Sequence, residues 1–187
     1  MPSATTTHGP RSWPFPCYFS WGGYSFAKRF TTLTHFWLGT SLLLAPLAAW
    51  IAIRGLEDLT VPLLLGGAVL FWVAGFDILY ACQDVDFDRR AKLYSVPAAL
   101  GVSTSLRVAL FCHVAMLAFL ASLYFAAADL GMIYLIGLIA VAILLAYEHW
   151  LIRPDDLSRV NQAFFQVNGI ISIGLFVVVL LQLAVKV

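Results

Sequence analysis

The most regular feature of the sequence is a series of long apolar stretches separated by shorter polar ones. A helix needs about 20 apolar residues to cross a bilayer. Five stretches are long enough, at about residues 35–53, 61–81, 106–127, 131–151 and 164–185. The pattern therefore predicts an all-α fold, a polytopic membrane helix bundle of about five transmembrane helices.

Composition supports a membrane location. Hydrophobic residues make up 61% of the chain and charged residues 11%, and the mean hydropathy is +0.89. A soluble domain carries about 25% charged residues, so most of this surface is expected to meet the lipid bilayer. The basic residues are scattered, which argues against a nucleic-acid partner. We expect Cys17, Cys82 and Cys112 to be small buried or interfacial residues rather than metal ligands.

The connections between the apolar stretches alternate in length and charge. Residues 54–60 and 128–130 are short and hold one basic residue, Arg54, whereas residues 1–34, 82–105 and 152–163 hold eight. Cytoplasmic connections carry an excess of Lys and Arg. We therefore expect a multi-pass protein of the cell inner membrane with its long connections in the cytoplasm.

Carboxylates concentrate at the end of the second apolar stretch. On a continuous α-helix, at about 100° per residue, Asp77, Asp84 and Asp88 fall within a stripe about 40° wide, and Asp86 points the opposite way. Asp77 follows an apolar run, where an ionised side chain costs a few kcal/mol unless it faces a polar cavity or a cation.

Two interpretations of this stripe remain open from the geometry alone. Arg89 or Arg90 could neutralise the carboxylates in a structural ion-pair network. Alternatively, the carboxylates bind Mg²⁺, a hard cation that takes one or two protein carboxylates and leaves its other positions to water and phosphate oxygens.

Three segments carry a resemblance to a known family. They are Asp77-x-x-Tyr80-Ala81-x-x-Asp84-x-x-x-Asp88 with Ser95-Val96-Pro97 and Gly101, Tyr24-Ser25-x-x-Lys28-Arg29-Phe30-Thr31 with Leu38-Gly39, and Tyr147-Glu148-His149 with residues 156–165. The first resembles the second aspartate-rich motif of the UbiA family of intramembrane prenyltransferases. The other two resemble segments of that family in the same order along the chain.

The resemblance implies a fold and an activity. It implies a nine-helix bundle around a cavity that is open to the bilayer. In that cavity Mg²⁺ would bind the diphosphate group of an isoprenyl diphosphate. An aromatic acceptor then takes the prenyl group. The implied acceptor is a compound such as 4-hydroxybenzoate, in ubiquinone or menaquinone biosynthesis.

The resemblance also implies residue roles. Asp77, Asp84 and Asp88 would bind Mg²⁺ and, with Tyr80, form the catalytic set, Tyr80 lining the cavity or shielding the allylic cation. The diphosphate would be bound by four residues near the start of the first span, namely Tyr24, Ser25, Lys28 and Arg29.

Simpler roles compete with some of these interpretations. Lys28 and Arg29 could be positive-inside anchors, and Tyr24 an interfacial aromatic. We expect the remaining polar residues of the spans to be structural, with His35 and His113 as packing residues and the others in hydrogen bonds within or between helices. The others are Glu148, His149, Asn161 and Asn168.

The sequence departs from the family pattern at two points. Lys92 stands where the family usually has Gly, which would add strain of about 1 kcal/mol if that position needs a positive φ. The family pattern also includes about four more helices and a first aspartate-rich loop upstream. We therefore expect residues 24–187 to be the C-terminal half of a UbiA-like domain, with residues 1–23 an unrelated tail or the product of a misjudged gene start.

Three functional hypotheses follow. In the first, the chain is part of a prenyltransferase and shows little or no turnover without its N-terminal half. In the second, it is a non-catalytic membrane fragment or scaffold. The third, a small cation-binding transporter, is disfavoured because the third, fourth and fifth spans have almost no polar residues at mid-depth.

Overall fold

The computed structural model describes residues 26–185, and most of them belong to five helices long and apolar enough to cross a membrane. These are α2 (Thr34–Arg54), α3 (Thr60–Ala81), α6 (Val102–Ala126), α7 (Met132–Leu151) and α9 (Asn168–Val185). The described residues contain no strand, only an isolated bridge between Arg153 and Asp156. The predicted all-α fold and the number of spans are confirmed.

Five shorter helical pieces extend or link the long helices. They are η1 (Cys82–Asp84, a 3₁₀-helix), α4 (Val85–Arg90), α5 (Val96–Leu100), α8 (Val160–Gln162) and η2 (Ala163–Val167, a π-helix). As a result α3 continues through η1 and α4 to Arg90, and α8 continues through η2 and α9 to Val185.

The short helix α5 is defined by its own sequence. The Ser95 hydroxyl accepts a hydrogen bond from the backbone N–H of Ala98 at 3.2 Å, which caps the start of the helix. Gly101 ends it with φ 77°, a conformation that favours glycine, and α6 begins at the next residue. Cap and glycine together separate α5 from the long helix that follows.

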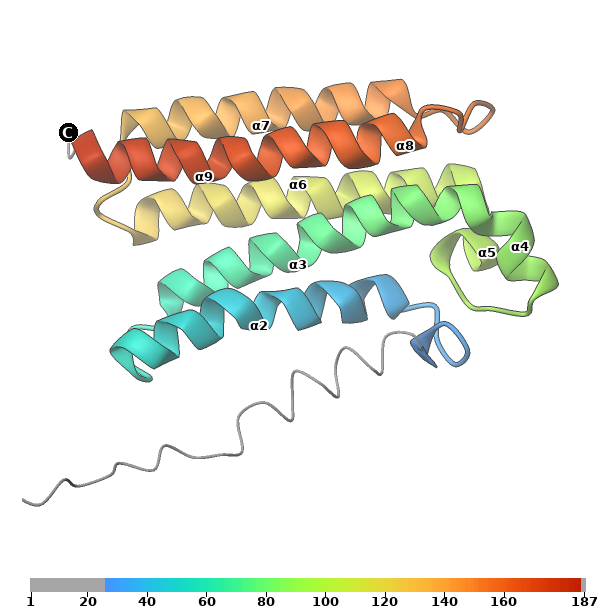
Figure 1. The fold of residues 1–187 in the computed structure, drawn as a ribbon, viewed down its shortest axis with the longest axis horizontal. Coiled ribbons are helices and arrows are strands. Elements are labelled where there is room, and N and C mark those ends of the chain that lie inside the picture. The colour runs from blue at the N-terminus through green and yellow to red at the C-terminus, as the bar shows by residue number, and fades with distance from the viewer. Residues whose placement is uncertain (1–25, 186–187) are drawn as a thin grey trace, which may run out of the picture.

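The five long helices lie side by side, with α3 and α6 in the middle, α2 on one side, and α7 and α9 on the other (Figure 1). One end of the bundle holds residues 26–33, 82–101 and 152–159, and we call it the aspartate end. The short α2–α3 and α6–α7 connections lie at the opposite end. The expected alternation of the connections is therefore confirmed, whereas the membrane side that each end faces stays a prediction.

Helices α2 and α3 approach each other closely at two glycines. A Cβ at Gly39 would collide with the backbone carbonyl of Leu70, and a Cβ at Gly66 would lie 2.9 Å from Cγ of Leu43. Lipid tails are as apolar as leucine, so helices in a bilayer associate through close packing rather than through the hydrophobic effect. The glycines therefore fix how α2 sits on α3.

The buried side chains form two clusters along α3 and α6. The cluster nearer the aspartate end includes Ala74, Ile78 and Cys112, and the deeper one includes Met116 and Ile171. Cys82 and Cys112 are buried and free, as predicted for small core residues. Cys17 lies outside the described residues.

Candidate functional site

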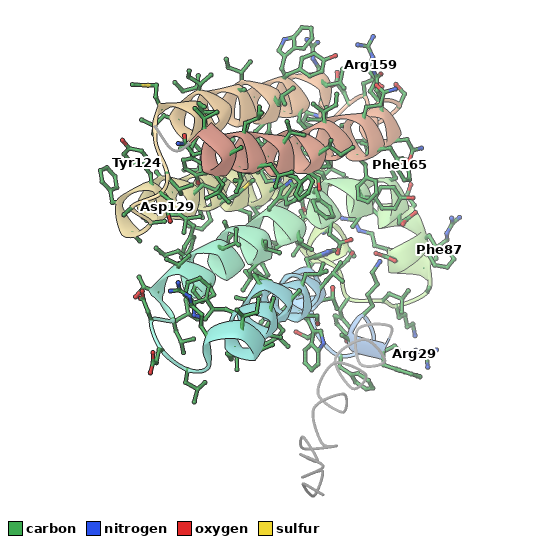
Figure 2. All side chains as sticks on the ribbon, turned by 60° about the vertical axis from the view of Figure 1, so that its left-hand side comes forward. Arg29, Phe87, Tyr124, Asp129, Arg159 and Phe165 are labelled. Atoms are coloured by element: carbon green, nitrogen blue, oxygen red, sulfur yellow. The ribbon has the colours of Figure 1, made fainter. Side chains whose placement is uncertain are left out.

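Charged and aromatic side chains from three separate segments meet at the aspartate end. Figure 2 places Arg29, Phe87 and Arg159 at this end, whereas Tyr124 and Asp129 lie at the other. The segments are the residues before α2, the run from η1 to α5, and the connection between α7 and α8.

Two residues of the predicted diphosphate-binding set, Tyr24 and Ser25, lie outside the described residues. The other two, Lys28 and Arg29, lie at the aspartate end, just before α2. Lys28 is half-buried and Arg29 is exposed. The structure therefore brings both described members of this set to the end of the bundle that holds the carboxylates.

The carboxylates do not follow one continuous α-helix, and that expectation is wrong. The α-helix gives way after Ala81 to the 3₁₀-helix η1 before α4 begins. A 3₁₀-helix turns by about 120° per residue instead of about 100°, so the residues beyond it are rotated relative to Asp77. Their surroundings differ as well, because Asp84 is exposed whereas Asp88 is only 1% exposed.

Asp77 is hydrogen-bonded to His35 of α2. The His35 Nδ1 lies 2.7 Å from Oδ2 of Asp77, and the backbone N–H of Val96 donates to His35 Nε2 at 3.3 Å. Because Nε2 accepts, the ring proton is on Nδ1 and is donated to the carboxylate. His35 is fully buried. It therefore binds both ends of the aspartate segment, residues 77–96.

Lys28 attaches the residues before α2 to the same segment. Its Nζ lies 3.6 Å from Oδ2 of Asp88, and its backbone carbonyl accepts a hydrogen bond from Tyr94 N–H at 2.6 Å. The N–H of Leu93 donates to the carbonyl of Asp88 at 2.8 Å. Lys28 thus provides a positive charge beside the buried carboxylate and a main-chain contact to the loop that follows it.

Tyr80 belongs to a group of aromatic rings next to the carboxylates. Its ring centroid lies 4.6 Å from that of Phe164, which also packs edge-on against Phe76 at 5.4 Å. Phe164 is part of the π-helix η2, a type of turn that is found often at functional sites. The half-buried Tyr80 ring is therefore held by the last membrane helix.

The predicted metal-binding carboxylates differ in how well their surroundings suit a cation. Within residues 26–185, no group of three or more His, Cys, Asp or Glu side chains is arranged to hold a metal ion. Oδ2 of Asp88, however, is buried without a hydrogen-bond partner, and buried carboxylate oxygens are normally satisfied. A carboxylate oxygen is the type of ligand that Mg²⁺ prefers. Asp88 therefore fits one ligand of a Mg²⁺ site, and the three-carboxylate site stays a prediction.

A second polar cluster lies inside the bundle. The Trp72 indole donates to Oδ1 of Asn168 at 2.9 Å, and Asn168 Nδ2 donates to Oε1 of Glu148 at 3.1 Å. Oε2 of Glu148 lies 3.8 Å from His113 Nδ1, which is 2.9 Å from His149 Nε2. The cluster links α3, α6, α7 and α9. The structural roles predicted for His113, Glu148, His149 and Asn168 are confirmed. The bond between helices expected for Asn161 is wrong, because its side chain is exposed and makes no such bond within residues 26–185.

His35 and Phe164 contact predicted site residues although the sequence did not single them out for the site. The sequence contained an indication for His35, because His35 lies at the beginning of the first span and Asp77 near the end of the second. Two consecutive antiparallel spans bring these positions to the same end of the bundle. Phe164 lies in the segment 156–165 that resembles the family, but that resemblance gave it no partner, since its contact with Tyr80 depends on the π-turn and on how the last helix packs.

A helix bundle whose ionisable residues collect at one end defines a class, that of integral membrane proteins with a polar site at the edge of the bilayer. Comparisons with known proteins narrow this class. The model of the UbiA prenyltransferase family matches residues 13–170, a match that begins upstream of the expected domain boundary at residue 24. The chain belongs to the UbiA prenyltransferase family.

Individual relatives agree with this assignment. A 4-hydroxybenzoate octaprenyltransferase of Marinobacter nauticus is 31% identical over 158 residues, which cover 81% of this chain and 52% of the relative. The mitochondrial 4-hydroxybenzoate polyprenyltransferase of Arabidopsis thaliana is 33% identical over 137 residues, covering 72% of this chain and 32% of the relative.

A solved structure is similar as well. The apo structure of a UbiA homolog from Aeropyrum pernix K1 superposes with a TM-score of 0.72 at 30% identity, covering 87% of this chain and 61% of that one. The chain spans about half the length of the curated relatives it matches.

Proposed function

We propose that this chain contributes part of a site that transfers a prenyl group from an isoprenyl diphosphate to an aromatic acceptor. The observation that carries the proposal is the buried Asp88 carboxylate, whose Oδ2 has no hydrogen-bond partner and lies 3.6 Å from the Lys28 ammonium. The Asp88 carboxylate could bind a metal ion, and the Lys28 ammonium beside it could bind a phosphate oxygen. Together they suit a diphosphate that carries a bound metal ion. The names of the relatives make 4-hydroxybenzoate the first choice of acceptor.

The carboxylates are assigned to a divalent cation. Asp88 would be one ligand of Mg²⁺, with the exposed Asp84 and the half-buried Asp77 as further ligands. Bound there, the ion would neutralise the negative charge that builds up on the diphosphate leaving group. His35 fixes the orientation of Asp77 through its Nδ1–H.

The cations before α2 are assigned to the diphosphate. Lys28 offers a point charge, and the exposed Arg29 offers a planar fork that matches two phosphate oxygens. Tyr24 and Ser25, which precede them in the sequence, would donate hydrogen bonds to the same group. These four residues bind and orient the diphosphate, so its scissile bond is held in a fixed position.

The aromatic and apolar surroundings are assigned to the allylic cation. The face of the Tyr80 ring can stabilise positive charge, and that ring packs against Phe164, which itself packs against Phe76. Apolar helices around the site exclude water, which would otherwise react with the cation.

The proposal includes a second set of ligands. Because the chain spans about half the length of its relatives, we assign these ligands to the part of the relatives that it does not match. The 187 residues tested alone are then expected to show little or no turnover. The proposed location is the inner membrane, with the aspartate end in the cytoplasm.

The test is prenyl transfer in isolated membranes that contain this chain together with the unmatched part of the Marinobacter nauticus relative. A labelled isoprenyl diphosphate and 4-hydroxybenzoate are the substrates. Asp88→Asn is expected to lower turnover about 100-fold, the size of loss seen when one group that stabilises charge is removed. Asp86→Asn, which removes an exposed carboxylate two residues away, is the matched control.

Three outcomes would contradict parts of the proposal. Equal losses of turnover in Asp88→Asn and Asp86→Asn would show that Asp88 has no specific role in the site. Full turnover in the presence of a chelator would show that the reaction does not require Mg²⁺. Rapid turnover by the 187-residue chain alone would show that no second set of ligands is needed.

A further inference from the structure

A pocket lies at the aspartate end of the bundle, and neither Asp77 nor Asp88 lines it. Its volume is about 350 Å³, and it is lined by Arg89, Lys92, Leu93, Tyr94, Ala98 and Ala99. Two of these six residues are positively charged and none is negatively charged. The charge of the pocket therefore favours an anionic ligand.

Arg89 is held in place at the pocket. Its Nε–H donates to the backbone carbonyl of Ala98 at 3.3 Å, which ties the end of α4 to α5. The bond uses one edge of the guanidinium, so the terminal nitrogens keep their capacity to donate to a phosphate. An arginine fixed in this way loses less conformational entropy when it binds an anion.

Lys92 has an unfavourable backbone conformation at the same pocket. Its φ is 55°, in the left-handed region where residues with a Cβ are strained. The backbone N–H of Lys92 donates to the backbone carbonyl of Arg89 at 3.3 Å, and this turn places both cationic residues at the pocket. Residues held in such a conformation cluster at functional and ligand-binding positions, since a glycine would adopt it without strain.

The walls and the rim of the pocket suit an amphipathic ligand. Leu93, Ala98 and Ala99 give it an apolar side. Tyr94 on the rim is 52% exposed, and the neighbouring Leu100 is 54% exposed. Exposed apolar and aromatic groups next to cations, at the ends of membrane helices, are typical of the level of the lipid headgroups.

We propose that this pocket binds the phosphate of an anionic phospholipid from the surrounding leaflet. Arg89 and Lys92 bind the phosphate oxygens, and Leu93, Ala98 and Ala99 contact the glycerol and the first acyl carbons. The pocket differs from the proposed prenyl-transfer site in its residues and its ligand, so this inference does not depend on that function.

The test measures lipid binding to the purified chain by native mass spectrometry, with phosphatidylglycerol as the anionic lipid and phosphatidylcholine as the neutral one. Lys92→Gly is expected to weaken phosphatidylglycerol binding about fivefold, the loss expected for one cation near a membrane surface. Its unfolding temperature is expected to stay the same or rise, because glycine relieves the positive φ. Weaker binding without lower stability cannot be attributed to misfolding.

Arg89→Gln is expected to show the same loss, and Arg90→Gln serves as the matched control. Arg90 is exposed and adjacent in sequence but does not line the pocket. An equal loss in Arg90→Gln would overturn the proposal, since binding would then depend only on total charge. Phosphatidylcholine binding as tight as that of phosphatidylglycerol would also overturn it.

A third arm separates a lipid from a soluble phosphate compound. Inorganic diphosphate at about 1 mM, a weak-affinity range, is added to the chain with bound phosphatidylglycerol. The lipid is expected to stay bound, because the apolar wall contributes to its affinity. Displacement of the lipid by diphosphate would overturn the lipid assignment and indicate a site for free phosphate compounds.

Discussion

The imidazole of His35 and the carboxylate of Asp77 meet across two helices, with Nδ1 and Oδ2 separated by 2.7 Å. His35 lies in the first turn of α2 and Asp77 in the last turns of α3, so the contact joins the two helices at the aspartate end. It accounts for a carboxylate that follows an apolar stretch, where an unpaired charge is costly.

The His35–Asp77 contact can be measured with a double-mutant cycle. His35→Leu and Asp77→Asn are each expected to destabilise the bundle, and their coupling energy is expected to be about 1 kcal/mol, typical of polar contacts between membrane helices. Unfolding in mixed micelles, followed by circular dichroism, gives the free energies. His35→Asn is the control, because its amide can still donate from nearly the same position. Effects that add without coupling would contradict the assigned bond.

Asn168 connects Trp72 to Glu148, and its removal takes a partner from the part-buried Trp72 indole N–H and from the buried Glu148 carboxylate. Asn168→Leu is therefore expected to cost about 1–2 kcal/mol of unfolding free energy. Asn161→Leu, at an exposed position seven residues earlier, is expected to change stability by less than about 0.5 kcal/mol. Equal effects of the two substitutions would rule out the interior hydrogen bonds.

Gly39 lies where α2 touches the backbone of α3. Because the obstacle to a Cβ is the carbonyl of Leu70, it cannot move aside as a flexible side chain would. Gly39→Ala is expected to destabilise the chain by about 1–3 kcal/mol. Gly174→Ala is the control, since its Cβ would have no neighbour within 4 Å, and it should be neutral or stabilising by up to about 1 kcal/mol. A neutral Gly39→Ala would contradict the close crossing.

Lys92 combines a side chain with a φ of 55°. Lys92→Gly is expected to raise the unfolding free energy by about 1 kcal/mol, because glycine adopts this conformation without strain. Lys92→Ala is the control, since it removes the same charge and retains the Cβ. If alanine stabilises as much as glycine, the charge rather than the backbone is responsible. Thermal unfolding in detergent distinguishes these outcomes.

Asp156 in the connection between α7 and α8 has a lowered pKa, chiefly because Oδ1 accepts hydrogen bonds from the Ser158 hydroxyl at 2.6 Å and from its N–H at 3.0 Å. Ser158→Ala is expected to raise the pKa of Asp156, as followed by carbon NMR during a pH titration. A lowered carboxyl pKa gives stability at pH values above the ordinary pKa, which is lost as the pH falls. The variant should lose less stability in acid. Ser158→Thr, which keeps a hydroxyl, should behave like the native chain.

The spans could be predicted from the sequence because a bilayer leaves few alternatives. Backbone groups in lipid must be satisfied within the chain, so an apolar stretch of sufficient length forms a helix. The family's usual glycine at position 92 also pointed to a position that could need a positive φ, and Lys92 has a φ of 55°. In both cases a local rule determines the outcome, and no knowledge of neighbouring helices is needed.

The partners of the carboxylates could not be predicted in the same way. The 3₁₀-helix at Cys82–Asp84 changes the direction of Asp84 and Asp88, and no residue in it marks the change. The contact of His35 with Asp77 depends on how far α2 is shifted along α3, which the packing of Gly39 on Leu70 determines. The position of one helix along another depends on how their side chains and backbones fit together. The hydrophobic pattern of the sequence does not determine that fit.

His35 holds both Asp77 and Val96, so it closes the aspartate segment at its base, much as a covalent cross-link would. Closing a flexible loop of about 20 residues costs entropy that grows with the logarithm of its length. In this chain that entropy is lost when the bundle folds rather than when a ligand arrives. A ligand that reaches Asp84 or Asp88 therefore meets a segment whose ends are already fixed, and more of its interaction energy remains for affinity.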